Sequence, residues 1–251
     1  MKKKGAYMNT RLPTVTVRGL SFVDADRTEL NELLRERLQS GNQTVIFTPN
    51  AKIGADALRN ARLHALLCRA DLLLPDGAGV LLASRYHADH PLRHRLPGIE
   101  AGETVLNLAA ELGLPVYFFG GEAGIAEKAA AHWQKRLPTL IVAGSHHGYV
   151  TTEQERNGVL QDIRQSGARV LLVCLGFPAQ EEWIDQNRAA LPSVRLFLGL
   201  GGSFDVWAGK LHRAPRVFRA LRMEWLWRML RQPRRFSQLP SMLRYVFGRQ
   251  N

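Results

Sequence analysis

The chain has 251 residues, of which 45% are hydrophobic, and a formal net charge of +12. This length and apolar content can bury the core of one large domain, which argues against a disordered chain. No apolar stretch follows the basic amino-terminal segment, and no window approaches the ~20 apolar residues that cross a bilayer, so any membrane contact should be peripheral. Cys68 and Cys174 both lie in apolar surroundings, so we expect two reduced core thiols and a cytosolic protein.

The charge is concentrated at the carboxyl end of the chain. Residues 208–251 contain eleven basic residues and one acid, Glu224, and therefore carry +10 of the +12. Charge this concentrated indicates an anionic partner. Aromatic residues are interleaved with the basic ones, a composition that suits a phospholipid surface at least as well as nucleic acid. We therefore divide the chain into a core, residues 1–207, and a basic, membrane-associating appendage, residues 208–251.

Short β-rich runs alternate with helical patterns along the core. Because these runs are continuously apolar, they are typical of strands buried on both faces, as in a parallel sheet covered by helices. The sequence therefore predicts an α/β core of Rossmann type, with a mostly parallel sheet and helices on both faces. In chain order the expected strands and helices are 14–20 and 28–40, 44–50 and 55–68, 71–77 and 79–86, 115–121 and 125–136, 139–145, 169–177 and 180–190, and 194–205.

The appendage is predicted to contain two helices. The first begins near Pro215, ends at Pro233 and repeats apolar residues every four positions on one face, at Val217, Leu221, Trp225 and Met229. A shorter helix is expected over residues 241–247, after Pro240. The first helix would be amphipathic, with a cationic side.

Ligands of open parallel sheets bind beyond the carboxyl ends of the strands, so the residues that end each run are the candidate site residues. Asp76 follows an apolar run and precedes a glycine-rich turn, where its carboxylate could act as a general base toward a hydroxyl. Alternatively, Asp76 is the N-cap of the helix that starts near Gly79. Thr48 and Asn50 flank Pro49 after another run, and either hold sugar hydroxyls or cap the next helix, with capping favoured.

Two further strand ends carry candidate residues. Gly120 and Gly121 are similar to a phosphate-binding turn, although the full dinucleotide spacing and the expected ribose-binding acid are missing, which disfavours a nicotinamide cofactor. The alternative is a tight connection. Gln180 and Glu181 open a helix after the most apolar run, and either hold a uracil or ribose or are simply favourable first-turn residues.

Asp24 and Asp26 have the spacing that metal-dependent sugar-nucleotide transferases use to hold a divalent ion. Thr28 and Glu29 follow them, however, and this pattern is more typical of the start of a helix. We therefore expect helix capping here, with metal binding as the alternative.

The strand ends form an ordered series that resembles the WecG/TagA/CpsF family of bacterial glycosyltransferases. The resemblance runs from about residue 44 to residue 235, and eight motifs in one order are far more specific than any one alone. The motifs are TPN at 48–50, ADLLLPDGAG at 70–79, RLPGIE at 95–100, GG at 120–121, HGY at 147–149, GFPAQE at 176–181, GLGGSFDVWAG at 199–209, and RAP with EWLWRMLRQPRR within 213–235.

The resemblance implies transfer of a sugar from a UDP-sugar donor to a polyprenyl-diphosphate-linked saccharide at the cytoplasmic face of the membrane. Transfer would proceed with inversion and without a metal or other cofactor. By motif, Asp76 matches the general base, Thr48 and Asn50 match residues beside it in the pocket, and Arg95 and Gln180 match substrate contacts. The appendage arginines that match those closing over the diphosphate are Arg228, Arg234 and Arg235.

Several questions stay open at this point. Leu96-Pro97 and Glu100 depart from the family pattern, so the donor sugar could be N-acetylmannosamine, its uronic acid or a glucose-type hexose. Two rival functions are a basic nucleic-acid-binding α/β protein, which would leave the polar strand ends unused, and a metal-dependent transferase using Asp24 and Asp26. We favour the metal-independent transferase without nucleic acid, and leave open whether it forms a homo-oligomer.

Overall fold

A computed structural model describes residues 12–215, 217–218 and 223–248. Its centre is a parallel sheet of six strands in the order β4-β3-β8-β7-β5-β6. The strands are β3 (Thr44–Phe47), β4 (Leu72–Leu73), β5 (Val116–Gly120), β6 (Val142–His146), β7 (Val170–Cys174) and β8 (Leu196–Gly199). The predicted parallel sheet is thus confirmed.

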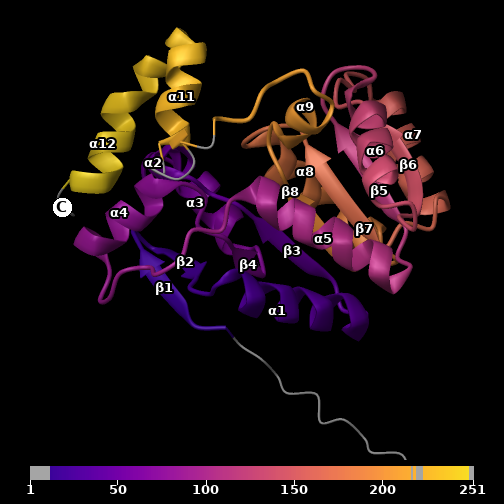
Figure 1. Cartoon of the computed structure of the whole chain (residues 1–251), viewed down its shortest axis with the longest axis horizontal. Helices are drawn as coiled ribbons and strands as arrows, with labels where there is room; N and C mark the ends of the chain where they lie inside the picture. The colour runs from indigo at the N-terminus through magenta and orange to yellow at the C-terminus, as the bar shows by residue number, and fades with distance from the viewer. Residues whose placement is uncertain (1–11, 216, 219–222, 249–251) are drawn as a thin grey trace, which may run out of the picture.

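Successive strand residues enter two separate cores, one on each face of the sheet. In β3, for example, Ile46 packs into one core, whereas Val45 and Phe47 pack into the other. The first face is covered by α1 (Arg27–Ser40), α5 (Gly98–Leu112), α6 (Ile125–Arg136) and α9 (Ser203–Trp207). The second is covered by α2 (Ala51–Arg59), α3 (Ala61–Cys68), α4 (Ala78–His87), α7 (Glu153–Gln165) and α8 (Ala179–Asn187), which continues into the short η1 (Arg188–Ala190). The helical layers on both faces are confirmed (Figure 1).

The structure corrects the predicted elements at three places. The run 14–20 is not a strand of the main sheet, because β1 (Thr14–Val17) and β2 (Leu20–Val23) form a separate antiparallel hairpin around the two-residue turn Arg18-Gly19. The predicted helix 55–68 is two helices, since the Asn60 side chain accepts hydrogen bonds from two backbone N–H groups and starts α3. Helices α5, α7 and α9 were not predicted, and α9 lies in part where the run 194–205 was expected to be β-rich.

The appendage folds as α11 (Glu224–Arg231), η2 (Pro233–Gln238) and α12 (Leu239–Phe247). The predicted continuous helix from Pro215 to Pro233 is wrong, because Met223 is not helical and α11 begins at the next residue. Leu221 lies outside the described residues. The end before Pro233 and the second helix are confirmed, with α12 beginning two residues early because proline is tolerated in a first turn.

Helix α12 packs against α2 and α4 of the core, although both are far from it in the sequence (Figure 1). The Tyr245 ring is buried against Gly54 of α2, where an added Cβ would lie 2.5 Å from the ring. Gly54 therefore provides the space that α12 needs. The packing makes α12 part of the second core.

The cysteines differ from each other in environment. Cys68 is exposed, so its prediction as a core thiol was wrong: it lies on the outer side of α3. Cys174 is buried at the end of β7, and this burial raises the pKa of its thiol. Neither forms a disulfide. Among the described residues we find no helix with the length and apolar character of a membrane span.

Candidate functional site

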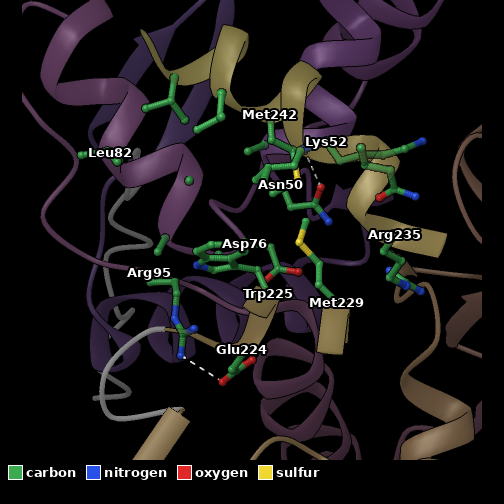
Figure 2. Close-up of a pocket in the computed structure, with 18 of the residues that line it drawn as sticks. Asn50, Lys52, Asp76, Leu82, Arg95, Glu224, Trp225, Met229, Arg235 and Met242 are labelled. Carbon is green, nitrogen blue, oxygen red and sulfur yellow. Dashed lines mark hydrogen bonds and ion pairs between the residues drawn. The ribbon is translucent and has the colours of Figure 1, made fainter. Parts of the chain in front are cut away.

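A pocket of about 220 Å³ lies beyond the carboxyl ends of β3 and β4, where α11, η2 and α12 cover the core. Residues from both parts of the chain converge on it (Figure 2). The core contributes Asn50, Lys52, Asp76, Leu82 and Arg95, together with the first turn of α4. The appendage contributes Glu224, Trp225, Met229, Arg235 and the inner face of α12. The position agrees with the rule for open parallel sheets.

Asp76 lines this pocket, half-buried, two residues before the start of α4. The N-cap residue of α4 is Gly77, which has no side chain. Asp76 is therefore not the N-cap residue of this helix. Its backbone N–H donates to the carbonyl oxygen of Pro49 at 3.2 Å, which joins the two turns that carry Asp76 and Asn50.

Asn50 and Thr48 have different environments. The Asn50 side-chain oxygen accepts hydrogen bonds from the backbone N–H groups of Lys52 and Ile53, at 3.0 and 3.1 Å, so the predicted capping role is confirmed, and the residue also lines the pocket. Thr48 is 9% exposed and its hydroxyl donates to the Gly199 carbonyl oxygen at 3.3 Å. It is not among the pocket-lining residues and instead ties β3 to β8.

Arg95 lines the pocket and forms an ion pair with Glu224, with 3.4 Å between Nη2 and Oε1. Both side chains are largely buried, at 14% and 17% exposure. Glu224 is the single acid of the appendage and lies in the first turn of α11, where a helix favours negative charge. The pair therefore links the appendage to the core at the pocket (Figure 2).

Gln180 and Glu181 are buried together at the start of α8. The Gln180 amide nitrogen donates to Glu181 Oε1 at 2.9 Å, and its amide oxygen accepts from the Gly201 backbone N–H at 2.8 Å. Burial raises the pKa of Glu181 to about 7, and its Oε2 has no hydrogen-bond partner among the described residues. Neither residue lines the pocket, and the Gln180 amide instead joins α8 to the turn after β8.

Gly120 and Gly121 lie at the end of β5, away from the pocket lining. An added Cβ on Gly120 would lie 2.3 Å from the carbonyl oxygen of Cys174, and the Gly121 N–H donates to that same oxygen at 2.9 Å. The glycines therefore allow β5 and β7 to approach closely. This geometry corresponds to the tight-connection alternative.

The three candidate arginines of the appendage are placed differently. Arg235 lines the pocket, and its Nε donates to the Gln232 side chain. Arg234 is exposed on η2 and is not part of the lining. Arg228 belongs to α11, but its side chain lies outside the described part of the structure. Arg235 is thus the appendage arginine that the described structure brings to Asp76.

Asp24 and Asp26 have structural roles at the start of α1. Asp26 accepts hydrogen bonds from the N–H groups of Thr28 and Glu29 in a capping box, as predicted. Asp24 is 3% exposed and accepts from both the backbone and the guanidinium of Arg93, at 2.9 and 2.8 Å. Burial is the largest single influence on the Asp24 carboxyl and raises its pKa. The hydrogen bonds and the charge of Arg93 together outweigh burial, so the pKa is lowered. No group of three potential metal ligands occurs among the described residues.

Comparison with known proteins identifies the family. The chain matches the glycosyl transferase WecG/TagA/CpsF family over residues 15–249. It is 33% identical over 236 residues to the N-acetylglucosaminyldiphosphoundecaprenol N-acetyl-beta-D-mannosaminyltransferase of Bacillus spizizenii, covering 94% of this chain and 90% of that protein. The enzyme of the same name from Staphylococcus aureus strain MW2 is 32% identical over 235 residues, or 93% and 91% of the two chains.

The chain belongs to the WecG/TagA/CpsF glycosyltransferases. The resemblance inferred from the motifs is confirmed, and the protein is an enzyme that transfers sugars. The match extends to residue 249 and so includes the appendage, which is part of the family sequence.

Sequence reasoning missed several residues that line the pocket of this glycosyltransferase. One of them is Lys52, which lies in the first turn of α2 and pairs with Asp56 at 2.6 Å. Glu224 also lines the pocket, although the sequence analysis used it only in the net charge of the appendage. The sequence did contain a signal for this placement: Glu224 is the one acid among eleven basic residues in 208–251. A single acid in such a basic segment suggests a specific basic partner.

Proposed function

We propose that this glycosyltransferase transfers N-acetylmannosamine from UDP to N-acetylglucosamine linked through a diphosphate to a polyprenyl lipid, with inversion at the anomeric carbon. Of the three sugars that the sequence left open, the names of the relatives support this one, and they also name the lipid-linked acceptor. The activation of the donor by UDP rests on the family resemblance.

The observation that carries the mechanism is the position of Asp76. Its carboxylate lines the pocket, while the N-cap position of α4 is taken by Gly77. In the proposed reaction Asp76 accepts the proton of the attacking acceptor hydroxyl as the bond to the anomeric carbon forms. General-base catalysis of this kind contributes about 10²–10⁴-fold to the rate.

The departing diphosphate needs positive charge as its bond to the sugar breaks. Arg95, Arg235 and Lys52 all line the same pocket. Arginine's planar guanidinium suits phosphate oxygens, and the amino-terminal turn of α4, whose N-cap is a glycine, adds backbone N–H groups. These groups support a mechanism in which side chains, without a metal ion, stabilise the leaving group. The alternative site at Asp24 and Asp26 is disfavoured because both carboxylates are already engaged by helix α1 and Arg93.

The test is UDP release from a panel of UDP-sugars, with a polyprenyl-diphosphate-linked N-acetylglucosamine acceptor in the presence of EDTA. We expect release with UDP-N-acetylmannosamine that requires the acceptor and persists in EDTA. Release only after a divalent ion is restored would contradict metal independence, and release with a different donor would contradict the proposed sugar.

We also infer that the enzyme acts at the cytoplasmic face of the membrane, held by the appendage on anionic lipid. Support comes from the appendage charge and from exposed apolar side chains on the described appendage, at Val217, Trp225, Leu230, Phe236, Leu243 and Phe247. A basic surface with amphipathic apolar residues is typical of peripheral membrane binding. Binding to duplex DNA with no affinity for UDP would favour the nucleic-acid alternative instead.

A further inference from the structure

The pocket beside Asp76 is divided by polarity. Its polar part holds Asp76, Arg95, Lys52 and Arg235, whereas its other wall is apolar and comes from α4, α11 and α12. That wall includes Leu82, Trp225, Met229, Met242, Leu243 and Val246. The polar part alone accounts for the sugar and diphosphate chemistry proposed above. The apolar wall has no role in that chemistry.

The apolar wall borders open space, unlike the rest of the core. Core side chains on both faces of the sheet are mostly 0–5% exposed and closely packed. Here Met229 and Val246 are 3% and 5% exposed yet still line a pocket of about 220 Å³. An apolar space beside a few converging polar groups is the usual form of a ligand site. Two of the wall residues are methionines, whose flexible side chains adapt to irregular apolar ligands.

The apolar surface continues from the pocket to the outside of the protein. Leu243 and Phe247 line the pocket and are 48% and 52% exposed. The Phe247 ring also contacts Tyr86 of α4 edge to face, with 5.3 Å between centroids, and Tyr86 is 59% exposed. A long apolar ligand could therefore enter the pocket with one end and extend along this rim.

We propose that the wall formed by α4, α11 and α12 binds the first isoprene units of the acceptor's polyprenyl chain. This inference rests on the proposed function and adds the lipid as a directly recognised part of the substrate. The acceptor carries a sugar hydroxyl, a diphosphate and an apolar chain in that order. The pocket offers a carboxylate, cations and an apolar wall that opens at the rim. The volume admits only the beginning of the chain, and the remainder stays in the membrane.

The binding test uses farnesyl diphosphate with a terminal benzophenone, photo-crosslinked to the full-length protein and mapped by peptide mass spectrometry. We expect labelling of α4, α11 or α12, and displacement by a polyprenyl-diphosphate-linked sugar. Labelling confined to other parts of the protein would overturn the proposal. So would equal displacement by phosphatidylglycerol, because the wall would then bind acyl chains in general.

Two matched variants separate the pocket from the membrane surface. Leu243→Asn changes a half-exposed residue of the pocket wall, and Leu230→Asn changes a leucine of α11 that is 55% exposed and outside the lining. We expect Leu243→Asn to weaken probe binding about five- to tenfold, from the lost apolar contact, with no change in Leu230→Asn. Equal losses in both variants would show that general surface hydrophobicity binds the probe, and would refute a specific site.

The same variants distinguish this inference from the proposed transfer. With a long-chain acceptor, Leu243→Asn should raise KM, while KM for an acceptor with a very short chain should be unchanged. Transfer that is indifferent to chain length and to this substitution would overturn the lipid site and leave the transferase intact. Site-specific labelling without transfer from any donor would overturn the proposed reaction and retain a prenyl-binding pocket.

Discussion

At the scale of single residues, backbone contacts hold Asp76 at the pocket. The hydrogen bond from its N–H to Pro49 connects the turns after β3 and β4, and Asn50 fixes the first of these turns by capping α2. Neither contact uses the Asp76 carboxylate. An amide at this position should therefore leave both turns in place.

Asp76→Asn should lower kcat about 100-fold or more, because the amide cannot accept the proton of the acceptor hydroxyl. Donor binding should be retained. Initial rates of UDP release measure the first effect and calorimetric titration with UDP the second. Asp89→Asn, at an exposed position just after α4, is the control that should retain full activity. Equal rates in the two variants would remove Asp76 from the mechanism.

Glu224 pairs with Arg95, so a diphosphate that binds Arg95 has to compete with this carboxylate. Ion pairs with some solvent access contribute about 0.2–1 kcal/mol. Glu224→Gln should therefore tighten binding of inorganic pyrophosphate about two- to fivefold, as measured by calorimetry at low salt. Glu122→Gln removes an acid that pairs with Lys210 outside the pocket and should have no effect. Unchanged or weaker binding in Glu224→Gln would show that the pair does not compete with the diphosphate.

Glu181 should make stability depend on pH. Burial raises its pKa from 4.5 to about 7, so the folded state favours the protonated acid, and this contribution is complete below about pH 4.5 and lost as the pH rises through 7. The shift corresponds to roughly 3 kcal/mol. Glu181→Gln, which mimics the neutral acid, should raise the urea midpoint relative to wild type at pH 8 and not at pH 5. Glu153→Gln, at an exposed position in α7, should show no such difference between the two pH values.

At the scale of elements, the hairpin β1–β2 holds the end of the appendage. Arg18, in the hairpin turn, is 7% exposed and donates to the carbonyl oxygens of Tyr245 at 3.1 Å and Arg244 at 3.3 Å, and also to that of Gly248. These carbonyls lie at the carboxyl end of α12, where a cation complements the helix dipole. Burial lowers the pKa of the Arg18 guanidinium, although the group stays charged.

Arg18→Ala should loosen α12 from the core while leaving the sheet folded. Hydrogen bonds to charged groups contribute about 1.5–3 kcal/mol, so amide hydrogen exchange in residues 239–247 should rise by at least tenfold. Arg164→Ala is a matched control, since Arg164 also donates to a backbone carbonyl, that of Ala190, but at an exposed position. Unchanged exchange in α12 would mean that the packing of Tyr245 against Gly54 suffices to hold the helix.

At the scale of the whole molecule, charge and apolar exposure coincide on the appendage. Basic residues near an anionic membrane contribute about 1 kcal/mol each, and this attraction falls off within a Debye length. Because α12 is packed on the core, the proposed membrane-binding surface is held next to the pocket. The acceptor, which is anchored in the same membrane, would reach the pocket without leaving its lipid phase.

Binding to phosphatidylglycerol vesicles should fall steeply between about 0.1 M and about 1 M salt, as the Debye length shortens from ~10 to ~3 Å. Neutral phosphatidylcholine vesicles should bind weakly at either salt concentration. Vesicle sedimentation measures both. Binding that does not respond to salt or to lipid charge would show that apolar insertion, without the basic residues, holds the protein.

The secondary structure shows where sequence patterns are sufficient and where they are not. The strands of the main sheet were predictable because burial on both faces produces continuous apolar runs. Helix α7 was missed because only Val159 and Ile163 are buried in it, which leaves a weak periodicity. The non-helical Met223 was missed because the four-residue spacing of apolar residues from Val217 to Met229 continues across it.

The sequence by itself determined the α/β class, the family and the acidic residue at the end of β4, because these depend on apolar runs and on motifs that are local in the chain. Only the tertiary structure decided which strand-end residues share a pocket. Asp76, Asn50 and Arg95 meet Arg235 there, whereas Thr48, Gln180, Glu181 and the glycines at 120–121 hold strands and turns together. The ion pair of Arg95 with Glu224 joins residues that are 129 positions apart in the sequence. The capping of α12 by Arg18 joins residues that are more than 220 positions apart. No local pattern encodes such pairs, since they arise from the packing of the appendage on the core.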